Sequence, residues 1–201
     1  YVLIGYVIHQ PLINIEAIWP IKPLENEINR LEDYDWLFFT SRYTVNFFFE
    51  ALGKKGKDAR HLAGLRIASV GRVTSAELKL HGIIPEIQAT EESSVGLLKD
   101  FETNNIPAGR VFIPRSDIGL PVLPDGLRRM GWKVTTVSVY HNTYPENLTA
   151  LDLSTIPNIV FSSPSCVTNF LKLYKQFPEG KNYICRGKET EKRFYETIQT
   201  I

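Results

Sequence analysis

The chain has 201 residues, of which 43% are apolar and 22% charged, and 23 Lys and Arg residues against 22 Asp and Glu residues leave a net charge of +1. A disordered chain would have fewer apolar residues and a larger charge imbalance, and a nucleic-acid-binding protein would show a basic excess. No apolar run approaches the ~18 residues of a membrane span. We therefore expect a soluble α/β protein, long enough for two domains of ~100 residues each.

The first half of the chain repeats a short apolar run, a glycine or small hydroxyl residue, and a segment of helical periodicity. This pattern predicts strands at 36–39 and 65–70, each followed by a helix. Ser41 is expected to cap the first helix, and Thr74 to open the second in a capping box with Glu77.

The next segments show the same kinds of strand and helix signals. Ser93 or Ser94 is expected to open a helix, residues 111–113 to form a strand, and residues 121–130 to form a helix that Gly131 closes. The β-branched alternation over 133–140 predicts another strand.

The pattern then restarts in the last third of the chain. Strands are predicted at 159–162 and 183–185. Ser163, followed by a proline, should begin the helix after the first of them, and Thr190 the polar helix after the second, which runs to about Thr200.

This restart indicates an internal duplication, because three segments match three others in the same order. The offsets between them shrink slowly along the chain. The matches are Gly5–Ile8 with Gly131–Val134 (131 − 5 = 126), Phe39–Ser41 with Phe161–Ser163 (163 − 41 = 122), and Gly71–Thr74 with Gly187–Thr190 (187 − 71 = 116).

The duplication predicts two similar α/β/α domains with parallel sheets, joined by a two-stranded linker, with a cleft between them. Domain 1 is expected to be discontinuous, at 1–16 and 147–201, and domain 2 to span 34–134. The stretches 17–33 and 135–146 are expected to be connectors. By the repeat, ~20 residues are expected before the first residue and ~20 after the last.

The hydroxyl residues at the predicted turns can bind anions, because a helix N-terminus offers unpaired amides and a partial positive charge. Ser41, Thr74, Ser163 and Thr190 occupy four such positions. Two interpretations remain open for each: a binding group, or an N-cap that serves stability alone.

Basic residues lie beside these turns and could add charge-assisted hydrogen bonds to an anion, although a solvated surface role explains each equally well. They are Arg42, Arg115 and Lys188.

The other motifs that could form a cofactor or metal site give only weak signals. Neither a P-loop nor a dinucleotide fingerprint is present, and the four histidines lack metal-ligand spacing, so no nucleotide and no metal is predicted. Cys166 and Cys185 form no disulfide framework, and Cys166 is interpreted as a packing residue.

Four segments together resemble the uroporphyrinogen-III synthase family: Phe39-Thr-Ser41, Val70-Gly-Arg-Val-Thr74, Gly131-Trp-Lys-Val134 with Val139-Tyr140 after it, and Phe161-Ser-Ser-Pro-Ser165. The resemblance covers most of the chain, and the order and spacing of the motifs carry it. It implies two α/β domains joined by a two-stranded ladder, with the first domain built from both chain ends.

The resemblance also implies a cofactor-free lyase that closes hydroxymethylbilane, an octacarboxylate, to uroporphyrinogen III while inverting ring D. The family's reaction is thought to begin with loss of the terminal hydroxyl and to pass through a spiro intermediate. Tyr140 matches the family's cleft tyrosine, and a phenol with a pKa of about 10 could supply the proton that this loss needs. A packing role for the Tyr140 ring is the alternative.

By the same resemblance Thr74, Ser41, Ser163 and Thr190 are substrate-binding candidates. Two departures matter: Glu191 follows Thr190 where the family usually has a small residue, and the family's N-terminal arginine has no counterpart. The alternative functions are a two-lobed anion-binding module without turnover and a nucleotide-using transferase. We expect a cytoplasmic monomer in transient contact with the upstream bilane-forming enzyme, with no nucleic-acid or membrane partner.

Overall fold

A computed structural model describes residues 6–199 and divides the chain into two compact units. Unit 2 is the continuous segment Ile15–Asn142. Unit 1 combines the chain up to Asn14 with the chain from Thr143 onward. Within the described residues, no helix is both long and apolar enough to cross a membrane.

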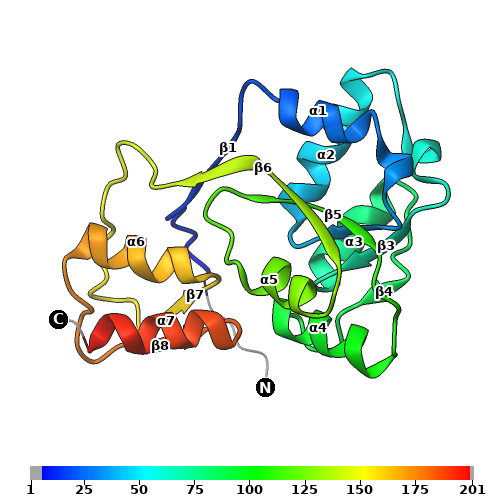
Figure 1. Cartoon of the computed structure of the whole chain (residues 1–201). Helices are drawn as coiled ribbons and strands as arrows, with labels where there is room; N and C mark the ends of the chain where they lie inside the picture. The colour runs from blue at the N-terminus through cyan, green and yellow to red at the C-terminus, as the bar shows by residue number, and fades with distance from the viewer. Residues whose placement is uncertain (1–5, 200–201) are drawn as a thin grey trace. The chain divides into compact units, whose positions relative to one another are not determined.

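Unit 2 is built on a mostly parallel sheet with the order β1-β6-β5-β2-β3-β4 (Figure 1). The pairs β6–β5, β5–β2, β2–β3 and β3–β4 are parallel. The strands are β1 (Asn14–Ala17), β2 (Trp36–Phe39), β3 (Arg66–Ser69), β4 (Ile87–Gln88), β5 (Arg110–Ser116) and β6 (Lys133–Thr143). The helices are α1 (Lys22–Ile28), α2 (Arg42–Lys54), α3 (Arg72–Leu80), α4 (Ser94–Thr103) and α5 (Val122–Arg129), with 3-10 turns at Leu31–Asp33 and Ala59–Leu62.

Strand β2 is buried on both faces because helices cover both sides of the sheet. Its side chains alternate: Leu37 and Phe39 enter the core formed with α1 and α2, whereas Trp36 and Phe38 enter the core formed with α4 and α5. In Figure 1, α1 and α2 lie above the sheet and α4 and α5 below it. Helix-covered faces on both sides are the arrangement of a doubly wound α/β fold.

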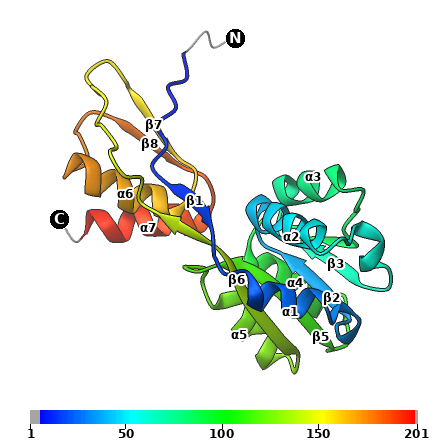
Figure 2. The ribbon, with the colours of Figure 1, turned by 90° about the horizontal axis from the view of Figure 1, so that it is seen from above.

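Unit 1 contains the parallel pair β7 (Asn158–Phe161) and β8 (Asn182–Cys185) with the helices α6 (Pro164–Tyr174) and α7 (Lys188–Ile198). Figure 2 places both helices on one side of this two-stranded sheet. Phe161, Phe170 and Phe194 form the core between sheet and helices.

The structure reproduces the predicted duplication in its hydrogen bonds. In unit 2 the Val70 N–H donates to the Phe39 carbonyl at 3.1 Å, and in unit 1 the Arg186 N–H donates to the Phe161 carbonyl at 2.9 Å. These two bonds are related by the sequence offsets of 116 (186 − 70) and 122 (161 − 39). The starts of α6 and α7 follow those of α2 and α3 by the same two offsets, so the two strand-helix pairs are copies of one arrangement.

One of the stretches expected to be connectors, 17–33, is in large part packed structure. Residues 17–33 contain α1 and a 3-10 turn, and Leu24, Ile28 and Leu31 are buried in the core of unit 2. Residues 135–143 belong to β6. The composition of these stretches is polar, but an apolar residue every three or four positions was enough to form a packed helical face.

The predicted starts of two helices need correction. Helices α3 and α7 begin after Gly71 and Gly187, so Thr74 and Thr190 are third helical residues and not N-caps, and no capping box with Glu77 forms. Residues 7–8, which match the start of the 133–140 strand in the duplication, form no strand, and Gly5 lies outside the described residues. Thr200, the expected end of the last helix, also lies outside them.

Candidate functional site

The carboxyl ends of the parallel strands form one edge of the unit 2 sheet. After β2 the chain adds β3 and β4 on one side, and then β5 and β6 on the other, so the strand order reverses between β2 and β5. Ligands of open α/β sheets bind outside the carboxyl ends at such a reversal point. Ser41 follows β2 and Ser116 ends β5, which places hydroxyl groups at this point.

Ser41 begins α2 and is both an N-cap, as predicted, and a partner of Tyr140. Its Oγ accepts from the Thr44 N–H at 3.2 Å, and the Thr44 side chain accepts from the Ser41 N–H, which completes a capping box. The same Ser41 Oγ lies 3.3 Å from the Tyr140 phenol oxygen. Two residues predicted for the site are therefore in contact.

Tyr140, near the end of β6, is buried, with 6% of its surface exposed. Its ring stacks on Phe47 at 5.7 Å between centroids and packs against Tyr43 at 5.8 Å. Burial raises the pKa of Tyr140, and this outweighs the hydrogen bonds from Ser41 and Ser116, which lower it. The phenol is therefore protonated at neutral pH and able to donate a proton.

Asp117 and His141 adjoin this group and were not predicted. The His141 Nδ1 lies 2.8 Å from Asp117 Oδ2, and the Ser116 hydroxyl donates to Asp117 Oδ1 at 3.1 Å. Parallel pairing of β5 with β6 brings these residues together across 24 positions of sequence. No local motif signals such a contact; only correct strand pairing could have revealed it.

Arg42 and Arg115 are the basic residues predicted for this edge. Arg42 donates to the Tyr43 hydroxyl at 3.1 Å and lies over that ring, 5.0 Å from its centroid. The hydrogen bond to Tyr43 raises the pKa of Arg42. Arg115 lies in β5, where partial burial lowers its pKa. Both are placed near the edge, and Arg42 touches a direct neighbour of Tyr140.

Thr74 lies in the first turn of α3, which follows β3 at the same edge. It is 4% exposed. Within residues 6–199 its hydroxyl makes no side-chain hydrogen bond, and the N-cap Gly71 has no side chain to occupy the turn. The stability role proposed for a capping threonine therefore does not apply to Thr74.

Unit 1 carries the two remaining candidates. Ser163 is the N-cap residue of α6, as predicted, but its hydroxyl donates to the Cys166 sulfur at 3.2 Å and caps no amide. Thr190 is 2% exposed and matches Thr74 at the offset of 116. In the described part of the chain its hydroxyl likewise has no side-chain hydrogen bond.

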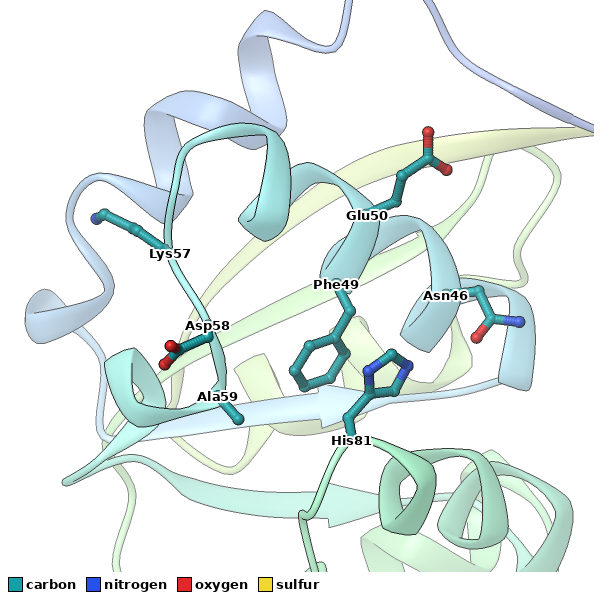
Figure 3. Close-up of a pocket in the computed structure, with 7 residues that line it drawn as sticks. All are labelled: Asn46, Phe49, Glu50, Lys57, Asp58, Ala59 and His81. Atoms are coloured by element: carbon teal, nitrogen blue, oxygen red, sulfur yellow. The ribbon is translucent and has the colours of Figure 1, made fainter.

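A hollow of about 510 Å³ lies elsewhere on unit 2, beside α2 and the end of α3 (Figure 3). His81 stacks flat on Phe49 there, with centroids 3.9 Å apart. Glu50 is paired with Lys54 and Asp58 with Arg60. None of the predicted site residues lines this hollow, which is formed by Asn46, Phe49, Glu50, Lys57, Asp58, Ala59 and His81.

Taken together, unit 2 has a doubly wound α/β fold, and at the reversal point of its sheet the buried Tyr140 phenol lies beside the hydroxyl of Ser41. The chain belongs to the uroporphyrinogen-III synthase family: the family model described as uroporphyrinogen-III synthase HemD matches residues 5–197.

Curated relatives agree in name and are longer than this chain. It is 28% identical over 193 residues to the porphyrin biosynthesis protein HemD of Ruminiclostridium josui, covering 91% of this chain and 38% of that protein. It is 26% identical over 149 residues to the uroporphyrinogen-III synthase of Chlorobaculum parvum, covering 71% of this chain and 61% of that protein. The chain thus spans between about a third and two thirds of the length of these relatives.

Solved structures of the family have the same fold. A mutant uroporphyrinogen III synthase from the extremely thermophilic bacterium Thermus thermophilus matches with a TM-score of 0.69 at 19% identity, over 94% of this chain and 79% of that one. The uroporphyrinogen-III synthetase from Helicobacter pylori 26695 matches with a TM-score of 0.58 at 19% identity, over 94% and 81%. These matches support the α/β fold with its mostly parallel sheet.

Proposed function

We propose that the protein is a lyase of tetrapyrrole biosynthesis that cyclises hydroxymethylbilane to uroporphyrinogen III with inversion of ring D. The family match over residues 5–197 supports the reaction. The contact between the Tyr140 phenol and Ser41 supports the site, because it sets a buried proton donor among hydroxyl groups.

Tyr140 is proposed to assist loss of the terminal hydroxyl of the bilane. Its proton passes to the departing oxygen, which leaves as water, and an electrophilic end remains that ring D attacks. A positioned acid contributes typically 10²- to 10⁴-fold to such a step. Without the enzyme the bilane closes directly to the type I isomer, so holding the reacting ends in the correct geometry is the second task of the site.

The eight carboxylates of the substrate are proposed to bind to helix N-termini, hydroxyls and arginines. In unit 2 the candidates are Ser41, Thr74, Arg42 and Arg115, and in unit 1 they are Ser163 and Thr190. The buried positions of Thr74 and Thr190, at the starts of two matching helices, support this assignment most directly. Carboxylates at helix N-termini are stabilised by the unpaired amides and the helix dipole.

Units 1 and 2 are proposed to be the two domains that the duplication predicts. Strands β1 and β6 are neighbours in one sheet. The division between the two units falls within β1, at 14–15, and within β6, at 142–143. This supports assigning these strands as the two-stranded linker. Because the bilane closes spontaneously when free, direct transfer from the bilane-forming enzyme to this protein is also proposed.

The deciding experiment is a product assay. The protein is incubated with freshly made hydroxymethylbilane, the product is oxidised, and the uroporphyrin isomers are separated by chromatography. We expect type III in excess over a protein-free blank. A folded sample that gives only type I at the blank rate contradicts the proposal; ligand binding by that same sample would favour the anion-binding module without turnover.

A further inference from the structure

We propose that Asp117 is a positioning residue that holds the end of β6 so that the Tyr140 phenol meets Ser41. This inference rests on the acid role proposed for Tyr140. It follows from an irregularity in the pairing of β5 with β6 and from the hydrogen bonds that Asp117 makes around it.

The irregularity is a bulge in β6. The two strands pair in step from Arg110 opposite Lys133 to Arg115 opposite Ser138, and the next pair is Ser116 opposite Tyr140. Val139 is therefore an extra residue in β6. Bulges of this kind redirect side chains and occur often beside active sites.

The bulge changes where Tyr140 points. Successive side chains of a regular strand alternate between the two faces, so Val139 and Tyr140 would lie on opposite faces of the sheet. Instead both belong to the same buried cluster, with exposures of 1% and 6%. The extra residue thus places the phenol on the face of the sheet that α1 and α2 cover, where Phe47 and Ser41 contact it.

Asp117 is hydrogen-bonded to the redirected residue itself and to the backbone two residues after it. Its own N–H donates to the Tyr140 carbonyl at 3.1 Å, and its Oδ1 accepts from the Asn142 N–H at 3.2 Å. The same Oδ1 accepts from the Ile118 N–H at 2.8 Å, which fixes the carboxylate against the turn after β5. One side chain therefore fastens this turn to the irregular end of β6.

His141 supports the carboxylate from the other side. Its Nδ1 lies 2.8 Å from Asp117 Oδ2, whereas the amides of Asn142 and Ile118 donate to the other carboxylate oxygen, Oδ1. Burial by itself would raise the pKa of Asp117, but the hydrogen bonds from His141, Asn142 and Ile118 lower it below its ordinary value. The group is thus an anion at neutral pH, the form that accepts hydrogen bonds at both oxygens.

Two substitutions separate the backbone bonds from the charge. Asp117→Ala removes the acceptor for the amides of Asn142 and Ile118 but keeps the backbone bond from residue 117 to the Tyr140 carbonyl, so the end of β6 is held less firmly. Asp117→Asn keeps a carbonyl oxygen for both amides and loses the charge and the second oxygen, the one that lies beside His141 Nδ1. We expect Asp117→Ala to lower kcat by about 10- to 100-fold, the cost of misplacing a reacting group by ~1 Å. We expect KM within about twofold of wild type and Asp117→Asn to retain most of the rate.

A double-mutant cycle tests whether Asp117 acts through Tyr140. If it does, Asp117→Ala in a Tyr140→Phe background lowers the rate no further. An equal fold loss in both backgrounds overturns the inference. Asp100→Ala is the matched control, because Asp100 also accepts a backbone N–H, that of Thr90 at 2.7 Å, and belongs to α4, which covers the other face of the sheet. It should leave kcat unchanged.

A second measurement does not depend on turnover. Amide hydrogen exchange over residues 138–143 should be faster in Asp117→Ala than in wild type or Asp117→Asn, because only alanine removes the acceptor. Equal exchange in all three proteins overturns the inference whatever the activity. A wild-type protein that forms no type III isomer contradicts the proposed function instead, and a fully active Tyr140→Phe variant contradicts the acid role alone.

Discussion

Replacing Tyr140 with phenylalanine removes one oxygen atom and leaves the packing of the ring intact. The stacked contact with Phe47 and the contact with Tyr43 involve only ring carbons. Ser41 keeps the Thr44 N–H as a partner, so the cap of α2 is preserved. The variant therefore isolates the chemistry of the phenol from its structural role.

The expected losses differ in size for rate and stability. The lower end of the range for a positioned acid, ~10²-fold, corresponds to about 2.7 kcal/mol of transition-state stabilisation. One neutral hydrogen bond contributes only about 0.5–1.5 kcal/mol to folding. The phenol is bonded to Ser41, at a long 3.3 Å, and to Ser116, so two bonds at the low end give a stability loss of about 1 kcal/mol, a fall in Tm of about 2–4 °C for a chain of this size.

The assay measures type III formation over the first minutes of reaction, with the type I background subtracted, and thermal unfolding of the same samples. Tyr183→Phe is the matched control: its hydroxyl donates to the Pro178 carbonyl at 2.8 Å in unit 1, and burial raises its pKa as well. The control should lose similar stability and no rate. Unchanged turnover in Tyr140→Phe would refute the acid role, as would an equal loss of rate in the control.

The raised pKa of Tyr140 adds a test at alkaline pH. A phenol with a folded-state pKa above its unfolded value of about 10 stabilises the folded state fully below pH 10. That contribution is lost as pH rises through the higher folded-state value. Urea unfolding should therefore show wild type losing more stability than Tyr140→Phe between pH 9 and pH 11. An identical loss in both proteins would contradict the raised pKa.

Other substitutions test the rest of the site and the packing. Thr74→Val keeps the shape of the side chain, so it should change the free energy of unfolding by less than ~1 kcal/mol, and it should slow type III formation; an unchanged or faster reaction would exclude a binding role. Gly96→Ala should cost about 1–3 kcal/mol in urea unfolding, because a Cβ would overlap the backbone carbonyl of Glu91, whereas most helical Gly→Ala changes are stabilising. Cys166→Thr should add about 0.5–1 kcal/mol by giving Ser163 the reciprocal capping partner present in unit 2; no gain would contradict this assignment.

The sequence predicted the repeated strand-helix pairs because their signals are local. Apolar runs, the N-cap serines and the positive-φ glycines at 82, 131 and 187 mark where elements begin or end. The offsets of 122 and 116 even give the correct pairing of β7 with β8 from that of β2 with β3. Helix α1 was missed because its apolar residues, Leu24 and Ile28, are few within a polar stretch.

The site was predicted only where it coincides with such local signals. Ser41 was found as a cap, and Tyr140 through resemblance to the family. Asp117 and His141 could not be found, because their contact depends on the bulge in β6 and on the parallel pairing of β5 with β6. A bulge of one residue reverses which side chains share a face, and alternation in the sequence cannot locate it.

The structure also separates the two interpretations that the hydroxyl residues allowed. Ser41 is a helix cap, because its oxygen accepts from the Thr44 amide, and its role in binding stays a prediction. For Thr74 and Thr190 the capping interpretation does not hold, because glycine is the N-cap residue of both helices. Both threonines are almost wholly buried, and neither is the cap of its helix. They occupy matching positions in the two copies of the repeat, at the offset of 116. We propose that a carboxylate of the substrate gives each hydroxyl a partner, and the duplication supports this proposal for the two threonines together more strongly than for either one alone.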